Sequence, residues 1–135
     1  MSRRFGEPIE EKKKEKSPAK KMRDKLDRLC GKVVRSAQEC FACGEVMERG
    51  NVYRCSTRYE CCHILSRGNL KIRHHPLNMV CMCNIHHRYY TTRTKDWDDL
   101  IDKKLPGRKD ELYELRRTCK TTPEEWETYW KNEPS

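Results

Sequence analysis

The chain has 135 residues, of which 38% are charged and 35% hydrophobic, so it supports one small domain with little apolar material for a core. No apolar run approaches the roughly 20 residues of a membrane span, and the lysine-rich start does not resemble a secretory signal. The formal net charge of +9 favours an anionic partner. Small folds of this kind are commonly stabilised by a bound metal.

The positive charge is concentrated in two segments. Residues 1–36 contain thirteen Lys or Arg against six Asp or Glu, and residues 49–95 contain nine basic side chains against one acid, Glu60. The segments between and after them carry net negative charge. A segment almost free of acids attracts polyanions, so nucleic acid is the expected partner. Charge alone is weak support, because many soluble proteins have basic stretches.

The N-terminal part divides into a tail and a helix. Residues 1–18 are rich in Lys, Glu, Arg and Pro and are predicted to form a disordered basic tail. Residues 19–36 are predicted as an N-terminal helix that Gly31 ends or weakens. The helical spacing is that of Met22, Leu26, Leu29 and Val33.

Residues 37–95 are predicted to form the core of the domain. Val52–Cys55, after the Gly50-Asn51 turn signal, has strand character, and Glu60–Leu65 is predicted as a second short strand. Pro76 interrupts the backbone, and a short helix is expected from about Asn84. The predicted order is therefore strand, loop, strand, loop, helix.

Residues 96–135 are predicted to form a helical extension. A first helix carrying Trp97 and Leu100 ends at Pro106-Gly107, and a second continues from Asp110. A third begins at Thr122 with a capping box. Its aromatic stripe is expected to pack in the core rather than stack on bases; the stripe comprises Trp126, Tyr129 and Trp130.

Two pairs of metal ligands, each spanning a two-residue gap, predict a structural zinc site. The predicted ligands are Cys40, Cys43, Cys83 and His86, because paired thiolates and imidazoles suit tetrahedral zinc. Cys81 is a poorer alternative to Cys83. The remaining cysteines are expected to be buried thiols, with a second metal site at Cys55, Cys61 or Cys62 as an alternative. Nine cysteines without a signal peptide favour a reducing compartment over disulfides.

Beside the zinc ligands lie the polar groups that phosphodiester hydrolysis requires: His63, Asn78 and His87, in that order. Hydrolysis needs a base for water, a cation near the phosphate and a group that orients the base. Alone, His63 would be an ordinary strand histidine, Asn78 a turn residue and His87 a spare zinc ligand. Their order, bracketed by zinc ligands, favours a nuclease.

These residues resemble the HNH (ββα-metal) endonucleases, most closely the small phage and prophage members that include the NinG-like recombination nucleases. The resemblance covers roughly Cys40–Tyr90 and extends more loosely over Trp97–Trp130. It lies in His63-Ile64-Leu65-Ser66-Arg67, His75-Pro76-Leu77-Asn78 and Cys83-Asn84-Ile85-His86-His87. It implies an α+β fold: a small zinc-stabilised ββα-metal core with flanking helices.

The resemblance also implies roles. His63 would be the general base, Asn78 would orient it, and His87 would bind a catalytic cation such as Mg²⁺, Mn²⁺ or another divalent ion. Many members carry an acidic ligand where this chain has Cys62, so Cys62 is a candidate ligand that would suit a softer ion. The predicted DNA-binding residues are Arg67, Arg73, Lys71, Arg88 and Arg93, while His74 and His75 are expected to be packed or solvent-facing.

The expected function is therefore metal-dependent cleavage of DNA, in phage or prophage DNA processing or recombination, in the cytoplasm of a bacterial host. One alternative is a non-catalytic zinc-binding module that binds DNA. Another is a phage packaging or replication accessory protein that docks a protein partner through its C-terminal helices.

Overall fold

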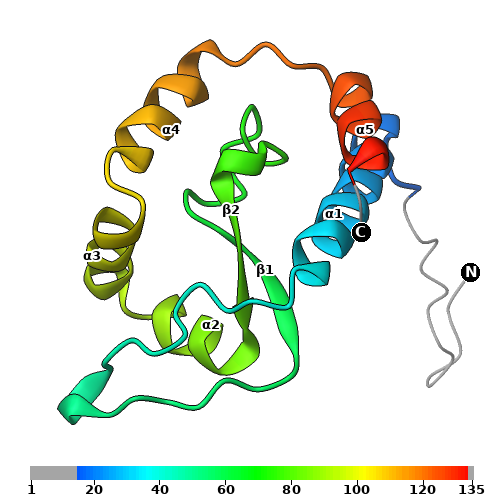
Figure 1. The fold of residues 1–135 in the computed structure, drawn as a ribbon. Helices are drawn as coiled ribbons and strands as arrows, with labels where there is room; N and C mark the ends of the chain where they lie inside the picture. The colour runs from blue at the N-terminus through cyan, green and yellow to red at the C-terminus, as the bar shows by residue number, and fades with distance from the viewer. Residues whose placement is uncertain (1–14, 134–135) are drawn as a thin grey trace, which may run out of the picture.

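The structure, a computed structural model, describes residues 15–133, so residues 1–14 of the predicted tail lie outside the described residues. Helices surround a two-stranded antiparallel sheet (Figure 1). The predicted mixture of helix and strand is thus confirmed. Within the described part of the chain, no helix is long and apolar enough to cross a membrane.

Helix α1, Pro18–Ser36, confirms the predicted N-terminal helix. The Ser17 side chain caps it by accepting a hydrogen bond from the Lys20 amide. Gly31 does not end the helix but lies buried within it. A Cβ atom at this position would lie 2.8 Å from a guanidinium nitrogen of Arg35, so glycine leaves room for that side chain.

The sheet consists of β1, Tyr59–His63, and β2, Met79–Cys83, paired with Cys61 opposite Cys81. The predicted strand at Val52–Cys55 is wrong: Val52 makes only an isolated bridge to Val46. The partner of β1 is instead β2, a segment for which we predicted no strand. Four of its five residues are buried. It therefore lacks the alternation of apolar and polar residues that identifies a strand with one solvent-exposed face.

Helix α2, Asn84–Thr91, follows β2 without a loop, with Cys83 as its N-cap. Its first turn carries two adjacent histidines. His86 is fully buried, whereas His87 is partly exposed. Because consecutive helical residues point about 100° apart, α2 presents its two imidazoles to different surroundings.

Helices α3 (Thr94–Lys104), α4 (Arg108–Thr118) and α5 (Pro123–Asn132) curve around the sheet and bring α5 against α1 (Figure 1). The capping box at Thr122 is present as predicted. Trp126 and Trp130 are buried against α1, so the expected core packing is confirmed for these two members of the aromatic stripe, whereas Tyr129 is exposed. The short 3-10 turns are η1, Glu48–Gly50, and η2, Pro76–Asn78.

Candidate metal centre and basic groove

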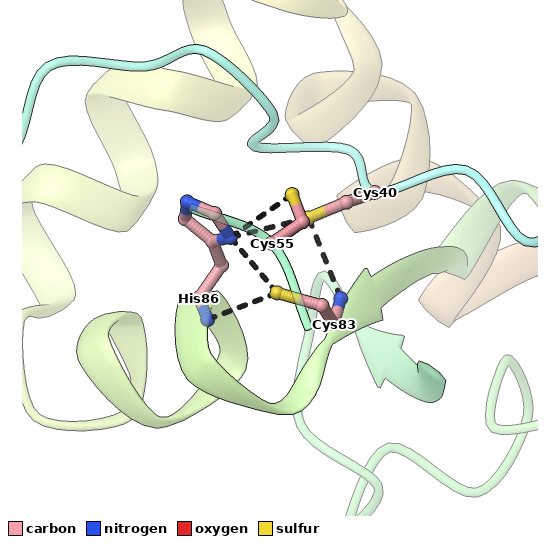
Figure 2. Close-up of side chains that lie close together, drawn as sticks. All are labelled: Cys40, Cys55, Cys83 and His86. Atoms are coloured by element: carbon pink, nitrogen blue, oxygen red, sulfur yellow. Dashed lines mark hydrogen bonds between the residues drawn. The ribbon is translucent and has the colours of Figure 1, made fainter. Parts of the chain in front are cut away.

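Three thiols and one imidazole converge at the start of α2, with all four ligand atoms within 4.8 Å of one another (Figure 2). The sulfur-to-Nδ1 distances from His86 are 2.9 Å for Cys83, 3.5 Å for Cys40 and 3.6 Å for Cys55. Tetrahedral zinc, with bonds of about 2.0 to 2.3 Å, places neighbouring N and S ligands about 3.5 Å apart. The cluster therefore has the ligands and spacing to hold a metal ion such as zinc.

The local backbone brings these ligands together. Cys83 closes β2 and caps α2, and its own amide donates to the sulfur of Cys40, at 3.4 Å. His86 follows one turn later, fully buried. Its Nε2 atom has no hydrogen-bond partner among the described residues. The three sulfur contacts are all made by Nδ1, so Nδ1 is the nitrogen placed to bind a metal, and the ring proton would then lie on Nε2.

The structure places Cys55, rather than the predicted Cys43, in the cluster. A tight turn in which the Cys43 amide bonds the Cys40 carbonyl leaves Cys43 exposed, with its thiol beside that of Cys55. Cys55 lies in the loop before β1 and has no ligand partner two residues away. Spacing alone therefore gave no sign that it belongs with Cys40, Cys83 and His86.

The thiols differ in how readily they ionise. Burial raises the pKa of Cys40 and Cys55. Burial acts in the same direction on Cys83, but hydrogen bonds from the amide and imidazole of His86 outweigh it and lower the pKa of Cys83 to about 6. Cys83 is therefore the thiol that is ionised first, and metal binding must displace protons from the others.

A groove of about 870 Å³ lies between α1, β1 and α2. Three arginines line it, Arg35, Arg58 and Arg67; sequence analysis had selected only the last. Arg58, just before β1, and Arg35, in the last turn of α1, belong to no sequence motif. They come together with Arg67 only in the folded chain. The groove also contains the predicted catalytic histidines His63 and His87, and its three arginines are the positively charged groups that could bind a phosphate.

His63 is held through its Nε2 atom, 2.8 Å from the backbone oxygen of Arg73. A carbonyl only accepts hydrogen bonds, so Nε2 carries the proton and Nδ1 carries the lone pair. Burial lowers the pKa of His63, although the contact with Arg73 opposes this. The imidazole is therefore neutral near pH 7, with one nitrogen able to accept a proton.

Asn78 is fully buried and bonds the loop that joins β1 to β2. Its Oδ1 accepts from the Leu65 amide at 2.7 Å, and its Nδ2 donates to the carbonyls of Leu65 at 3.1 Å and Ile72 at 3.3 Å. Asn78 thus touches the loop that carries Arg73, not the His63 ring. Any influence on His63 passes through that backbone.

His87 contacts Glu60 across the wall of the groove, with its Nδ1 2.9 Å from a carboxylate oxygen. Both side chains are partly exposed. Cys62 also lines the groove, but it is 3% exposed and packs in the core. Burial raises the pKa of its thiol, so Glu60 is the better placed anionic ligand beside His87.

The other predicted DNA-binding residues do not share one surface. Arg93 is paired with Glu48 and lies over the Tyr89 ring, away from the groove. Lys71 and Arg88 are exposed. Arg73, predicted to hold phosphate, instead makes an ion pair with Asp27 of α1. The sequence gave no sign of this pairing because the two residues lie in different predicted elements.

Comparisons with protein-family models, with curated proteins and with solved structures find no match to this chain.

Proposed function

We propose that the protein is a metal-dependent endonuclease of the HNH (ββα-metal) type that hydrolyses phosphodiester bonds in DNA, in phage or prophage DNA processing. The observation that carries the proposal is the state of His63: a neutral imidazole in an arginine-lined groove, with Nε2 bonded to the Arg73 carbonyl. A general base needs this combination of an available lone pair and a fixed ring. The order of β1, β2 and α2, with His87 in α2, further supports it.

In this proposal, Nδ1 of His63 takes a proton from water as the oxygen attacks phosphorus. Arg67, on the same groove wall, binds a phosphate oxygen and positions the strand, as Arg35 and Arg58 do for neighbouring phosphates. Phosphate contacts position a substrate without selecting its sequence. We therefore expect weak sequence specificity and affinity that falls with salt.

The groove also offers ligands for the divalent cation that this chemistry uses. His87 and Glu60 converge on one position and supply a nitrogen and a carboxylate oxygen, a donor set suited to Mn²⁺, Mg²⁺ or Ni²⁺. A cation bound there would neutralise charge on the scissile phosphate. Cys62, buried and protonated, is not needed as a ligand in this arrangement.

A plasmid-nicking assay across Mg²⁺, Mn²⁺, Ni²⁺ and EDTA tests the proposal with the wild type, His63→Ala and His75→Ala. His75 is a half-buried histidine of the same loop that does not line the groove. We expect His63→Ala to lower cleavage by about 100-fold or more, with bound zinc retained and His75→Ala close to wild type. Equal nicking by wild type and His63→Ala would contradict the proposal.

The rival function is a non-catalytic zinc-binding module that binds DNA. The burial of Cys62, where many HNH enzymes have an acidic ligand, favours it. A zinc-loaded wild type that binds DNA yet leaves it intact with every cation would support this module. The other alternative, docking through the aromatic stripe of α5, has only Tyr129 exposed to support it, because Trp126 and Trp130 are buried.

A further inference from the structure

Asp27, a residue of α1 that no motif singled out, holds the two residues at the end of the β1–β2 loop. One carboxylate oxygen accepts from Nε of Arg73 at 3.0 Å and from Nε2 of His74 at 2.7 Å. The other accepts from Nη2 of Arg73 at 2.6 Å. A forked, charge-assisted pair of this kind fixes orientation as well as distance.

Other contacts hold the same loop residues. The indole nitrogen of Trp130 in α5 donates to the His74 carbonyl at 2.9 Å. Nη1 of Arg73 donates to the Arg67 carbonyl at 3.3 Å. The side chains of Arg73 and His74 are 14% and 7% exposed, so the pair with Asp27 is shielded from the solvent that weakens surface ion pairs. Residues 73–74 are therefore held by α1 and α5.

The backbone oxygen of Arg73 is also the acceptor for Nε2 of His63. One residue thus connects Asp27, through its side chain, to His63, through its carbonyl. Burial opposes ionisation of Asp27, but hydrogen bonds from Arg73 and His74 outweigh it and lower the pKa of its carboxyl. The carboxylate is therefore charged throughout the pH range in which His63 is neutral.

We propose that Asp27 is a positioning residue: by fixing Arg73, it holds the carbonyl that keeps His63 protonated on Nε2 and leaves Nδ1 as the proton acceptor. This inference rests on the proposed function for its kinetic consequences. In this proposal α1 and α5, which lie outside the strand–strand–helix unit, help to fix the orientation and protonation of the His63 ring. A purely structural ion pair would stabilise the fold without affecting the state of the imidazole.

The matched variants are Asp27→Asn and Asp24→Asn. Asp24 lies one turn earlier on the same helix, and among residues 15–133 its salt bridges are to Lys16 and Lys20, so its loss removes the same charge without touching residues 73–74. For Asp27→Asn we expect about a 10-fold or greater fall in kcat with KM within about twofold and zinc content unchanged. Asp27→Glu, which keeps the carboxylate, should recover part of the loss. Asp24→Asn should match the wild type.

A second readout does not depend on cleavage. The ¹⁵N shifts of the His63 ring report which nitrogen carries the proton, and we expect Nε2 in the wild type and in Asp24→Asn. Asp27→Asn should show a mixture of both forms. If it is too unstable to measure, Arg73→Lys, which keeps the charge but removes the fork, should show the same mixture.

The two proposals fail in different ways. An unchanged His63 ring and unchanged kcat in folded Asp27→Asn would overturn the positioning role. If the wild type cleaves no DNA, the proposed nuclease function is overturned. If Asp27→Asn then still shows both protonated forms of the His63 ring, the positioning role of Asp27 is retained.

Discussion

Two adjacent histidines of α2 lie in two different regions, a closed cluster of metal ligands and an open groove. His86 is fully buried among three thiols, with all the ligand atoms within 4.8 Å of one another. His87 stands at the wall of an open, arginine-lined groove and contacts a single partly exposed carboxylate. The first region has a complete ligand set, whereas the second leaves room for water, a cation or a phosphate.

Under the proposed function, this difference separates the groups that stabilise the fold from the groups that carry out the reaction. A closed four-ligand site has no position left for a substrate and so contributes folding energy. An open site with a fixed base can react because its groups are not saturated. A single helix start connects the two regions, so a metal ion bound by the cluster would order the segment that carries His87.

The largest expected effect comes from breaking the closed region. Cys83→Ser should unfold the domain, as should strong chelation, because structural zinc contributes on the order of 10 kcal/mol, which exceeds the net stability of many small domains. Circular dichroism and metal analysis measure both changes. Cys43→Ser is the control and should stay folded, since Cys43 lies outside the ligand set. Loss of zinc and of the fold in Cys43→Ser would contradict the assignment of Cys55 as the fourth ligand.

The next effect concerns the loop that links the strands. Asn78→Ala removes three buried hydrogen bonds to Leu65 and Ile72 and should cost about 3 kcal/mol in the free energy of unfolding. Urea denaturation of the zinc-loaded protein measures it. Asn69→Ala is the control, because the side chain of Asn69 bonds Ser66 within an exposed turn. Equal costs for both variants would show that Asn78 does not hold the loop.

A smaller effect should identify the cation ligand in the open region. Glu60→Gln keeps the shape of the side chain but removes its charge, and should raise the Mn²⁺ concentration for half-maximal nicking by about 10-fold. Cys62→Ser should leave that concentration unchanged. The reverse pattern would return Cys62 to the cation site and exclude Glu60.

The pH dependence gives the mildest test. Burial lowers the pKa of His63 below its usual 6.5; the hydrogen bond to the Arg73 carbonyl and the charge of Asp27 oppose this, while the charges of Arg67 and Arg73 act with burial. Folding thus favours the neutral imidazole, and its contribution to stability is present above pH 6.5 and lost as pH falls toward the folded pKa. Nicking should be level from pH 8 to 6.5 and decrease below it. An activity limb above pH 7 would indicate another base.

The sequence predicted whatever depended on local pattern. The spacing of Met22, Leu26 and Leu29 identified α1, and Thr122 identified the start of α5. Three of four cluster ligands came from paired spacing, because a two-residue gap is itself a geometric constraint. The expected packing of Trp126 and Trp130 was confirmed because aromatic residues at helical spacing usually form core.

What was missed depends on contacts between distant segments. Strand β2 is a buried apolar run without alternation, so only its pairing with β1 distinguishes it. Cys55 joins the cluster by loop conformation, and Asp27 reaches Arg73 across 46 residues. The sequence also gave no sign that the guanidinium of Arg73, predicted to hold phosphate, is paired with Asp27 in the fold.

The most direct test compares the two adjacent histidines as His86→Ala and His87→Ala. Bound zinc, the unfolding transition and plasmid nicking in Mn²⁺ are measured together for each variant. We predict that His86→Ala loses zinc and the folded state, whereas His87→Ala keeps both and loses nicking. If His87→Ala nicks DNA like the wild type, or if His86→Ala stays folded with zinc bound, the division into a closed metal site and an open reactive groove is wrong.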